Sequence, residues 1–177
     1  SRPSTPPNRL NIPVTVTLEE AYTGTKRQVM IPNKTKRRRI EVSIPPGVDS
    51  DSIVHITLEK GSELYLTITV SPHTHFRRTG VNVEYDPEVP VEVAVLGGEV
   101  DVPTLTGRIR LKIPPESQNG QRIRLLGQGM PSLTESGEKG ALYVIVRPRL
   151  PKDLTDEERK LFERLKELRG TGATEGV

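Results

Sequence analysis

Apolar and polar residues alternate along several short stretches in the first half of the chain. Every second residue from Leu10 to Leu18 is apolar, which is the period of a β-strand with one buried face. Shorter stretches of the same kind cover residues 27–31, 38–44, 52–58 and 63–70, with Pro, Gly and Asn residues between them. Because those residues favour turns, the pattern predicts a series of short strands joined by tight connections.

Residues 18–22 interrupt the alternation. Thr17 and Glu20 have the spacing of a capping box, in which each side chain accepts a hydrogen bond from the other residue's backbone N–H at the start of a helix. Gly24 follows at a position suited to end a helical turn. A short helix is therefore predicted between the first two strands.

The second half of the chain repeats this plan. The sequence "EVPVEVAVLGG" at 88–98 matches "TVTLEEAYTGT" at 15–25, and "RIRLKIPP" at 108–115 matches "RIEVSIPP" at 39–46. The match places Ala94 on Ala21, Gly97 on Gly24, Val102 on Val29, Ile113 on Ile44 and Leu142 on Leu64. A recurring strand order with a helical turn in the same place indicates two like-folded domains. We therefore predict a mainly β protein with two tandem, similar β-sandwich domains.

Residues 154–168 change from the strand period to the helix period. Their apolar positions are Leu161, Phe162, Leu165 and Leu168. Thr155 and Glu158 supply a second capping box, so an amphipathic helix of about four turns is predicted. A helix this short is marginal alone in water, so its apolar stripe needs a surface to cover. That surface is either the chain's own second β domain or the same helix of a second copy.

The predicted elements divide the chain into consecutive parts. Residues 1–9, rich in Pro and Ser, are interpreted as the remnant of a flexible linker to an upstream segment. The first β domain is expected at 10–80, the second at 81–152 and the helix at 153–169. A disordered tail is expected at 170–177.

Composition limits the classes of function. The chain has no Cys, which excludes disulfides, a Cys-ligated zinc site and a Cys nucleophile. No apolar run approaches the roughly 18 residues of a membrane span, so we expect a cytoplasmic protein with no membrane partner. The formal net charge of +3 is mildly basic, which leaves nucleic acid open as a partner without arguing for it.

Motifs for catalysis and cofactors are weak or missing. His73 and His75 stand two apart without a recognisable third ligand, so they are interpreted as loop or packing residues, and no metal site is predicted. The sequence "GQGMP" at 127–131 lacks the helix and the Lys-Ser/Thr pair of a phosphate loop and is interpreted as a turn. No Gly-x-Ser-x-Gly motif is present. The sequence predicts a protein that is not an enzyme and needs no cofactor.

Five longer motifs occur in order between residues 10 and 168: "VTLEEAYTGT", "IEVSIPPGV", "LYLTITVSPHTHFRRTG", "AVLGGEVDVPTLTGRIRLKIPPESQNGQRIRLLGQGMP" and "GALYVIVRPRLPKDLTDEERKLFERL". Together they resemble the C-terminal substrate-binding region of DnaJ-family co-chaperones. Only eight residues separate Ile31 from Ile40, which leaves no room for the Cys-rich zinc module of many members. The chain therefore resembles the zinc-free subclass, and its printed residues lack the His-Pro-Asp motif of a J domain.

The resemblance implies a dimeric clamp that holds unfolded client polypeptide and presents it to a DnaK-type chaperone. The homodimer would form through Leu161, Phe162, Leu165 and Leu168. The family's client pocket falls on Ile12, Val14, Val29, Ile31 and Leu66, with Arg27 at its basic rim. Periodicity alone favours an ordinary core role for these apolar residues. The resemblance favours the pocket, less so for Leu66.

A run of positive charge, "KTKRRR", lies at 34–39. Its charged residues are Lys34, Lys36, Arg37, Arg38 and Arg39. They are open to three interpretations, namely a solvated hairpin face, a phosphate-binding surface, and a contact for the acidic tail of a partner chaperone or for acidic clients. Few aromatic residues accompany the run, which weakens a single-stranded nucleic-acid interpretation. Association with DNA remains the alternative function.

Overall fold

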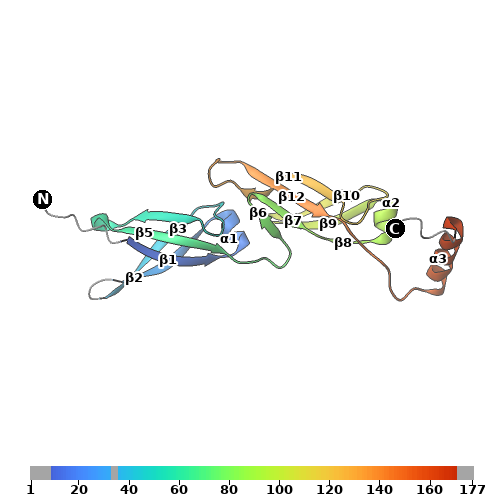
Figure 1. Cartoon of the computed structure of the whole chain (residues 1–177), viewed down its shortest axis with the longest axis horizontal. Helices are drawn as coiled ribbons and strands as arrows, with labels where there is room; N and C mark the ends of the chain where they lie inside the picture. The colour runs from blue at the N-terminus through green and yellow to red at the C-terminus, as the bar shows by residue number, and fades with distance from the viewer. Residues whose placement is uncertain (1–8, 33–35, 171–177) are drawn as a thin grey trace, which may run out of the picture.

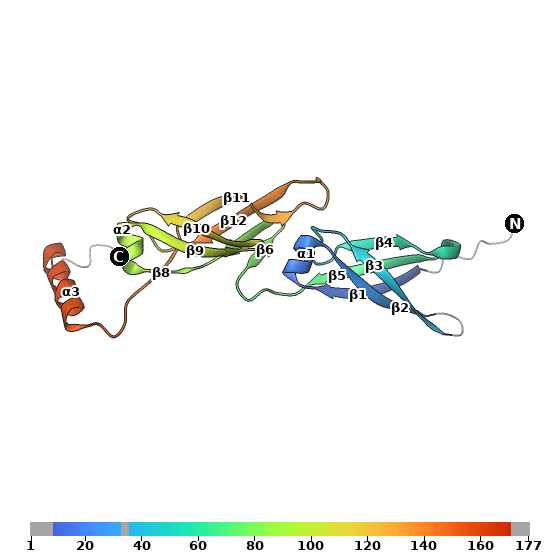
Figure 2. The same cartoon turned by 180° about the vertical axis from the view of Figure 1, so that it is seen from behind.

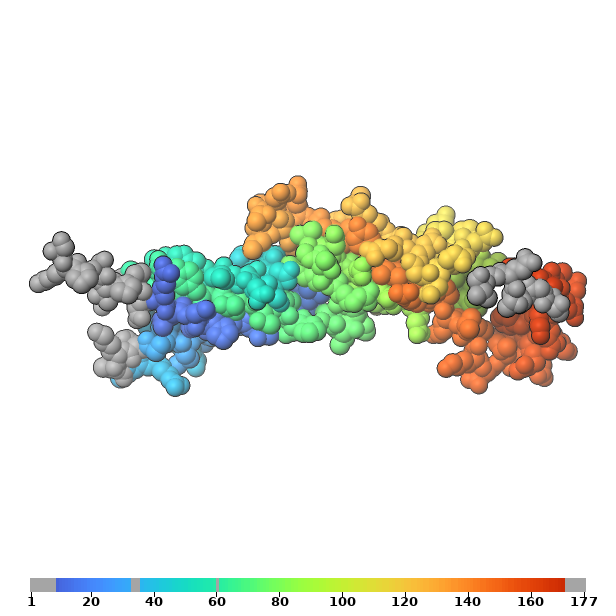
Figure 3. Space-filling model, in the orientation of Figure 1, coloured from blue at the N-terminus to red at the C-terminus, as the bar shows by residue number. Residues whose placement is uncertain are grey.

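The computed structural model describes residues 9–32 and 36–170 of the 177-residue chain. Two β units lie end to end, and one helix stands beyond the second unit (Figure 1). The space-filling view shows the same elongated outline (Figure 3). The predicted mainly β fold with a C-terminal helix is confirmed. The predicted linker and tail lie almost wholly outside the described residues, as does Lys34.

The first unit is built from two groups of strands, a sheet in the order β1-β5-β4 and a β2-β3 hairpin. Their bounds are β1 Arg9–Val16, β2 Thr25–Pro32, β3 Arg37–Ile44, β4 Ile53–Thr57 and β5 Glu63–Val70, with a 3-10 turn at Glu59–Gly61. β1 runs parallel to β5, with Arg9 opposite Glu63 and Val16 opposite Val70, whereas β4 pairs with β5 antiparallel. The strands predicted from the alternating stretches are confirmed.

The core of the first unit lies between the sheet and the hairpin. Leu64, Leu66 and Ile68, at alternating positions of the central strand β5, are 0% exposed. Val42 and Ile44 of β3 are buried in the same apolar cluster. Burying such side chains stabilises the fold by about 1.5–3 kcal/mol each. The period-two pattern thus marks the inner face of each strand.

A helical turn of the same kind follows the first strand of each unit. α1 Leu18–Thr23 begins at Thr17, whose side chain accepts a hydrogen bond from the Glu20 N–H, and both bonds of the predicted capping box are present. Gly24 ends α1 with a φ of +75°. The equivalent helix, α2 Val91–Leu96, ends at Gly97 with a φ of +79°. These matching ends confirm the repeat in this region.

The strands of the second unit follow a related order. A four-stranded sheet runs β11-β12-β7-β6, and two further pairs are β13-β8 and β10-β9. Their bounds are β6 Arg77–Thr79, β7 Asn82–Tyr85, β8 Glu88–Pro90, β9 Gly98–Thr104, β10 Gly107–Ile113, β11 Arg122–Pro131, β12 Lys139–Ile145 and β13 Arg147–Arg149. β7 pairs with β12 and β8 with β13, both in parallel, as β1 does with β5. The first strand of the unit is therefore present in two pieces.

The register confirms which residues of the two units correspond. Leu10 lies opposite Leu64 in the first unit, and Val83 lies opposite Leu142 in the second. The sequence repeat places Leu142 on Leu64, so Val83 corresponds to Leu10. β6 precedes the predicted division at residue 80 but pairs with β7 of the second unit, and the domain bounds themselves stay a prediction.

The two units meet through polar contacts around Arg78. Its side chain is only 9% exposed, and its guanidinium donates to the carbonyls of Val48 at 2.6 Å and Gly47 at 3.2 Å. Lys139 of β12 donates to the Tyr22 hydroxyl at the end of α1, at 2.6 Å. These bonds connect the second unit with the end of the first unit that carries α1. Figures 1 and 2 show this junction from opposite sides.

The last element is α3, Asp156–Arg169. Its predicted capping box is present, with Glu158 N–H donating to Thr155 and Glu158 accepting in return. None of its residues is buried, so the helix does not cover the second unit of its own chain. Of the two surfaces considered from the sequence, the chain's own second β domain is therefore not used in this structure. Among the described residues, no helix has both the length and the apolar character needed to cross a bilayer.

The glycine at the end of α2 offers a test of how closely this helix end is packed. A Cβ on Gly97 would lie 3.1 Å from the Pro115 nitrogen and 3.2 Å from the Ile113 carbonyl oxygen. Gly127 also has positive φ, but a Cβ there meets nothing within 4 Å. We expect Gly97→Ala to lower the free energy of unfolding by about 2–3 kcal/mol and Gly127→Ala by about 1 kcal/mol. Equal losses in denaturant unfolding would contradict the packed role of Gly97.

Candidate functional site

The predicted pocket residues come from three strands of the first unit. Ile12 and Val14 alternate along β1, Val29 and Ile31 alternate along β2, and Leu66 lies on β5 directly opposite Ile12. The structure therefore brings residues distant in the sequence to one region between the sheet and the hairpin. The chain folds this way locally because each strand turns its apolar positions inward.

The exposed fraction of the side chain differs among these five residues. Leu66 is 0% exposed, Val14 and Val29 are each 7% exposed and Ile31 is 8% exposed, while Ile12 is half-buried. Leu66, Val14 and Val29 belong to the main apolar cluster, and Ile12 packs against it. In this conformation most of these side chains serve as core, and Ile12 is the most accessible of them. Their role in binding stays a prediction.

Strand edges are available beside this apolar group. β1 pairs only with β5 and β2 only with β3 in the described part of the chain. Each strand therefore has one edge whose backbone N–H and C=O groups have no ladder partner. Pro13 on β1 lacks an N–H, which is typical of an edge strand. An extended polypeptide can pair with such an edge while its alternate side chains contact the apolar residues.

Arg27, predicted at the basic rim, is held by an ion pair. Its guanidinium donates to Glu20 Oε2 at 2.6 Å, and the two side chains are 35% and 27% exposed. The same carboxylate accepts the Thr17 N–H at 2.9 Å. The hydrogen bond from Arg27, followed by that from the Thr17 backbone, lowers the pKa of Glu20 below its usual range. The rim cation is thus fixed beside the start of α1.

The described part of the basic run is fully on the surface. Lys36, Arg37, Arg38 and Arg39 are all exposed, the last three at the start of β3. Arg38 lies opposite Ile31 of β2 and 3.6 Å from the Glu59 carboxylate. The run therefore lies at the hairpin end beside one pocket residue.

The apolar stripe of α3 is exposed as well. Its members Leu161, Phe162, Leu165 and Leu168 are 64%, 42%, 47% and 67% exposed. Apolar residues placed at helical spacing and left in solvent are typical of a contact surface.

The two histidines take part in local packing. His73 Nε2 lies 2.8 Å from a Glu19 carboxylate oxygen, and its Nδ1 accepts the N–H groups of His75 and Phe76 at 3.0 and 3.1 Å. These bonds fix the turn between the units, as expected of a packing residue. Within residues 9–32 and 36–170, no three His, Cys, Asp or Glu side chains gather as metal ligands would.

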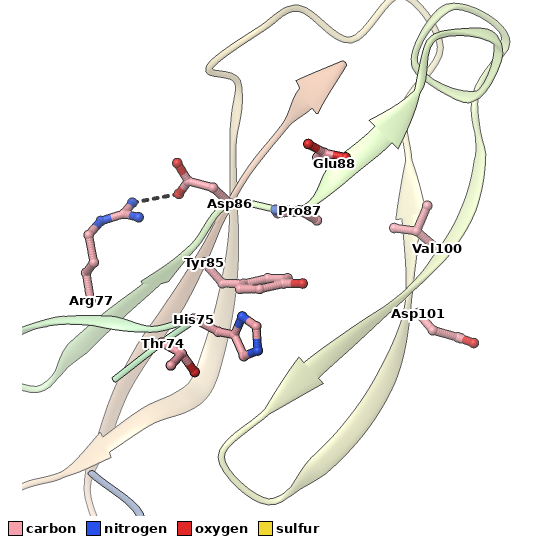
Figure 4. Close-up of a pocket in the computed structure, with 9 residues that line it drawn as sticks. All are labelled: Thr74, His75, Arg77, Tyr85, Asp86, Pro87, Glu88, Val100 and Asp101. Carbon is pink, nitrogen blue, oxygen red and sulfur yellow. Dashed lines mark hydrogen bonds and ion pairs between the residues drawn. The ribbon is translucent and has the colours of Figure 1, made fainter. Parts of the chain in front are cut away.

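Sequence reasoning missed a cavity in the second unit. It has a volume of about 560 Å³, and Tyr85, Val100 and Asp101 are among the residues that line it (Figure 4). Asp86 and Arg77 also line it, and Asp86 accepts from Arg77 at 2.6 Å and from Arg147 at 3.1 Å. Partial burial raises the pKa of Asp86, but the two guanidinium groups outweigh it and the net shift is downward. The internal repeat is the only sequence signal that points to this place.

The fold and site define the class of protein before any comparison. Two repeated β units, an open strand edge beside apolar side chains and a solvent-exposed amphipathic helix define an elongated tandem β-domain protein. The family model described as "DnaJ C terminal domain" matches residues 10–151. The chain belongs to this family, and the resemblance stated from its motifs is confirmed.

Individual relatives support the same assignment. A chaperone protein DnaJ from Roseiflexus castenholzii is 43% identical over 136 residues, covering 72% of this chain and 36% of that protein. Chaperone protein DnaJ 2 from Thermus thermophilus is 36% identical over 157 residues, covering 86% and 54%. The chaperone protein DnaJ of Deinococcus proteolyticus is 36% identical over 155 residues, covering 86% and 48%. The chain thus spans about a third to a half of these relatives.

The ion pair at the rim gives a pH-dependent test. Because the folded-state pKa of Glu20 lies below the ordinary value of 4.5, ionised Glu20 stabilises the fold above that pH, and this contribution is lost as the pH falls through the folded-state pKa. We expect Arg27→Met to lower the free energy of unfolding by about 0.5 kcal/mol at neutral pH. The difference from the parent should shrink in acid.

Lys26→Met is the matched control, because Lys26 is 69% exposed and 3.7 Å from its Glu41 partner. Urea unfolding at several pH values measures both variants. A loss for Arg27→Met that stays constant into acid would contradict the role of Glu20.

Proposed function

We propose that this chain binds unfolded or non-native polypeptide in an extended form along the open edges of β1 and β2. Membership of the DnaJ C-terminal family supports the choice of client. The observation that carries the proposal is a pair of edge strands, β1 and β2, beside apolar residues that differ in exposure. These residues are Ile12, Val14, Val29, Ile31 and Leu66. Backbone pairing would supply affinity for any sequence, and the apolar side chains would favour segments that should be buried in a native fold.

Opening of this region would break no ladder hydrogen bonds between β1 and β2. β1 and β2 belong to different sheets and share no ladder hydrogen bonds in the described residues. A small separation of the two strands therefore breaks apolar contacts that an entering client side chain restores. Leu66 lies beneath as the fully buried floor. The residues thus serve as core in the free chain and as pocket walls in the bound one.

We further propose that two copies join through α3 and present the client to a DnaK-type chaperone. The four exposed apolar residues of the helix support a contact between two helices. Two joined copies would hold one long client at two places, and the second contact would gain from the effective concentration set by the first.

The basic run supports a partner of acidic chemistry. Lys36 to Arg39 are exposed at the hairpin end next to the proposed groove, so an acidic chaperone tail or an acidic client segment could be attracted there over about a Debye length. The DNA alternative rests on charge alone. It predicts binding that weakens steeply with salt and does not involve the apolar group.

Substitution at the hairpin end of the groove tests client binding. Ile31→Ser should weaken binding of an apolar extended peptide by about five- to tenfold, because one buried aliphatic contact is lost. The adjacent Met30→Ser is the control, since Met30 is 44% exposed and points to the opposite face of the strand. Fluorescence anisotropy with a labelled peptide measures both. A lower melting temperature with unchanged affinity per folded molecule would make Ile31 a core residue only.

The helix contact has its own test. Leu165→Gln should give a monomer at about ten micromolar, where the parent chain is expected to be partly dimeric because a contact this small gives modest affinity. Glu163→Gln, also on α3 and exposed, should leave the dimer intact. Light scattering over a concentration series decides between them. A parent chain that is monomeric throughout would refute the proposed interface.

A further inference from the structure

The second unit is attached to the first unit at two separate places. The sheet β1-β5-β4 reaches it through the chain itself, because β5 ends at Val70 and the connection from residue 71 leads to β6. The β2-β3 hairpin reaches it through residues 45–48, which follow the end of β3 at Ile44. We call residues 45–48 the junction turn. Both attachments lie at the end of the first unit that carries α1 (Figures 1 and 2).

The attachment of the sheet is held by hydrogen bonds along the connection. The Ser71 N–H donates to the Val16 carbonyl at 2.8 Å, so the end of β1 is bonded to the chain that leaves β5. His73 Nε2 lies 2.8 Å from the Glu19 carboxylate, and its ring lies 5.0 Å from that of Phe76 between centroids. Phe76 is buried in the main apolar cluster. The connection is therefore fixed at several points and differs from a flexible linker.

The attachment of the hairpin depends on the Arg78 side chain. Arg78 of β6 is 9% exposed and donates to the carbonyls of Val48 and Gly47 in the junction turn. A Cβ on Gly47 would lie 2.8 Å from the Leu133 nitrogen of the second unit, so the two backbones are close as well. The Gly47 N–H donates in turn to the Ala21 carbonyl of α1 at 2.8 Å. A shift of this turn therefore either breaks hydrogen bonds or moves the second unit with it.

Client entry requires a movement that the junction turn shares. The proposed groove lies between β1 of the sheet and β2 of the hairpin, which share no ladder hydrogen bonds in the described residues. β2 pairs with β3 along its full length, from Thr25 opposite Ile44 to Pro32 opposite Arg37. When β2 tilts away from β1, β3 tilts with it, and the turn that follows Ile44 must adjust.

We propose that occupation of the client groove is coupled to the angle between the two units, and that Arg78 is the positioning residue that couples them. When a client separates the hairpin from the sheet, the junction turn moves and Arg78 moves the second unit with it. The hydrogen bonds of Arg78 are made with the groove closed, so they favour the closed groove in the free chain. This inference rests on the proposed function, since a bound client is its input.

Two spin labels measure the angle on the intact chain. The chain has no Cys, so Thr57→Cys on β4 and Lys112→Cys on β10, both exposed, place labels at two chosen positions only. The probe is an extended peptide that alternates leucine with glutamine. It should shift the distribution of label distances in the parent chain. In Arg78→Met the distribution should be broader without the peptide and should not shift when the peptide binds.

Linkage gives a second readout, which a merely structural role of Arg78 would not produce. Because its hydrogen bonds favour the closed groove, Arg78→Met should raise the affinity for the peptide, per folded molecule, by about two- to threefold. Tyr22→Phe removes only the hydroxyl that accepts from Lys139 at 2.6 Å between the units. It should raise the affinity by a smaller factor, and it keeps the test valid if Arg78→Met folds poorly. Fluorescence anisotropy with the labelled peptide measures both variants.

Arg77→Met is the matched control for Arg78→Met. Arg77 is the preceding residue on β6 and is 54% exposed, and in the described residues its guanidinium bonds to Glu84 and Asp86 of the second unit. The substitution removes the same charge without removing a bond to the first unit. Both the label distances and the peptide affinity should therefore match those of the parent chain.

A measurement without any client tests the coupling separately. A Cys introduced at Val29, where the native side chain is 7% exposed, reports opening of the groove through its rate of thiol labelling. Arg78→Met should increase this rate by about two- to threefold, whereas Arg77→Met should not. A Cys at Ile68, where the native side chain is 0% exposed, reports general loosening of the same core. Equal acceleration at both positions would overturn the coupling.

The outcomes separate this inference from the proposed function. A peptide that binds with no change in label distance, and with equal affinity for the parent and Arg78→Met, would overturn the coupling and leave the client groove standing. Faster labelling at Val29 alone in Arg78→Met would support the coupling even if no peptide bound to the chain.

Discussion

A parallel ladder between an early and a late segment of each unit is the constraint on which the other features depend. β1 and β5 are in register over their full lengths, although α1, β2, β3 and β4 all lie between them in the sequence. A parallel pair cannot be closed by a tight turn, so the intervening chain must cross over the sheet. The crossover supplies the β2-β3 hairpin that covers the core. It also leaves β1 at the end of its sheet with an unpaired edge.

The second unit keeps the parallel pairing although its first strand and its helix differ from those of the first unit. Its first strand is divided at Asp86 and Pro87, yet β7 and β8 keep parallel partners in β12 and β13. α2 lacks the side-chain cap of α1, with Pro90 in place of Thr17, but it retains the glycine that ends the helix. The parallel ladder and the glycine at the helix end are present in both units because they determine the path of the chain across the sheet. Side chains along the open edge are free to differ, as Val100 differs from Arg27.

The sequence pattern predicted the positions of the strands and helices better than it predicted whether their apolar residues form a core or a groove. Alternation located the strands, and the pairs Thr17–Glu20 and Thr155–Glu158 located both capped helices, because these signals depend on neighbours a few residues away. Period two also put Val14 and Val29 on one face, but it does not distinguish a core from a groove. That difference depends on the sheet order, which is set by pairing across the whole unit. The cavity beside Val100 depends on residues from three separate segments and was not predicted.

The junction limits how the two units can act together. Arg78 is almost wholly enclosed, and its guanidinium is satisfied by the carbonyls of Val48 and Gly47 and lies 3.6 Å from Asp49. Swinging the units apart would break these hydrogen bonds, and water would have to replace the protein partners of the guanidinium and the two carbonyls. A Cβ on Gly47 would also lie only 2.8 Å from the Leu133 nitrogen, so the backbones are in close contact there. These polar contacts and the close backbone approach therefore oppose a change in the relative placement of the two units.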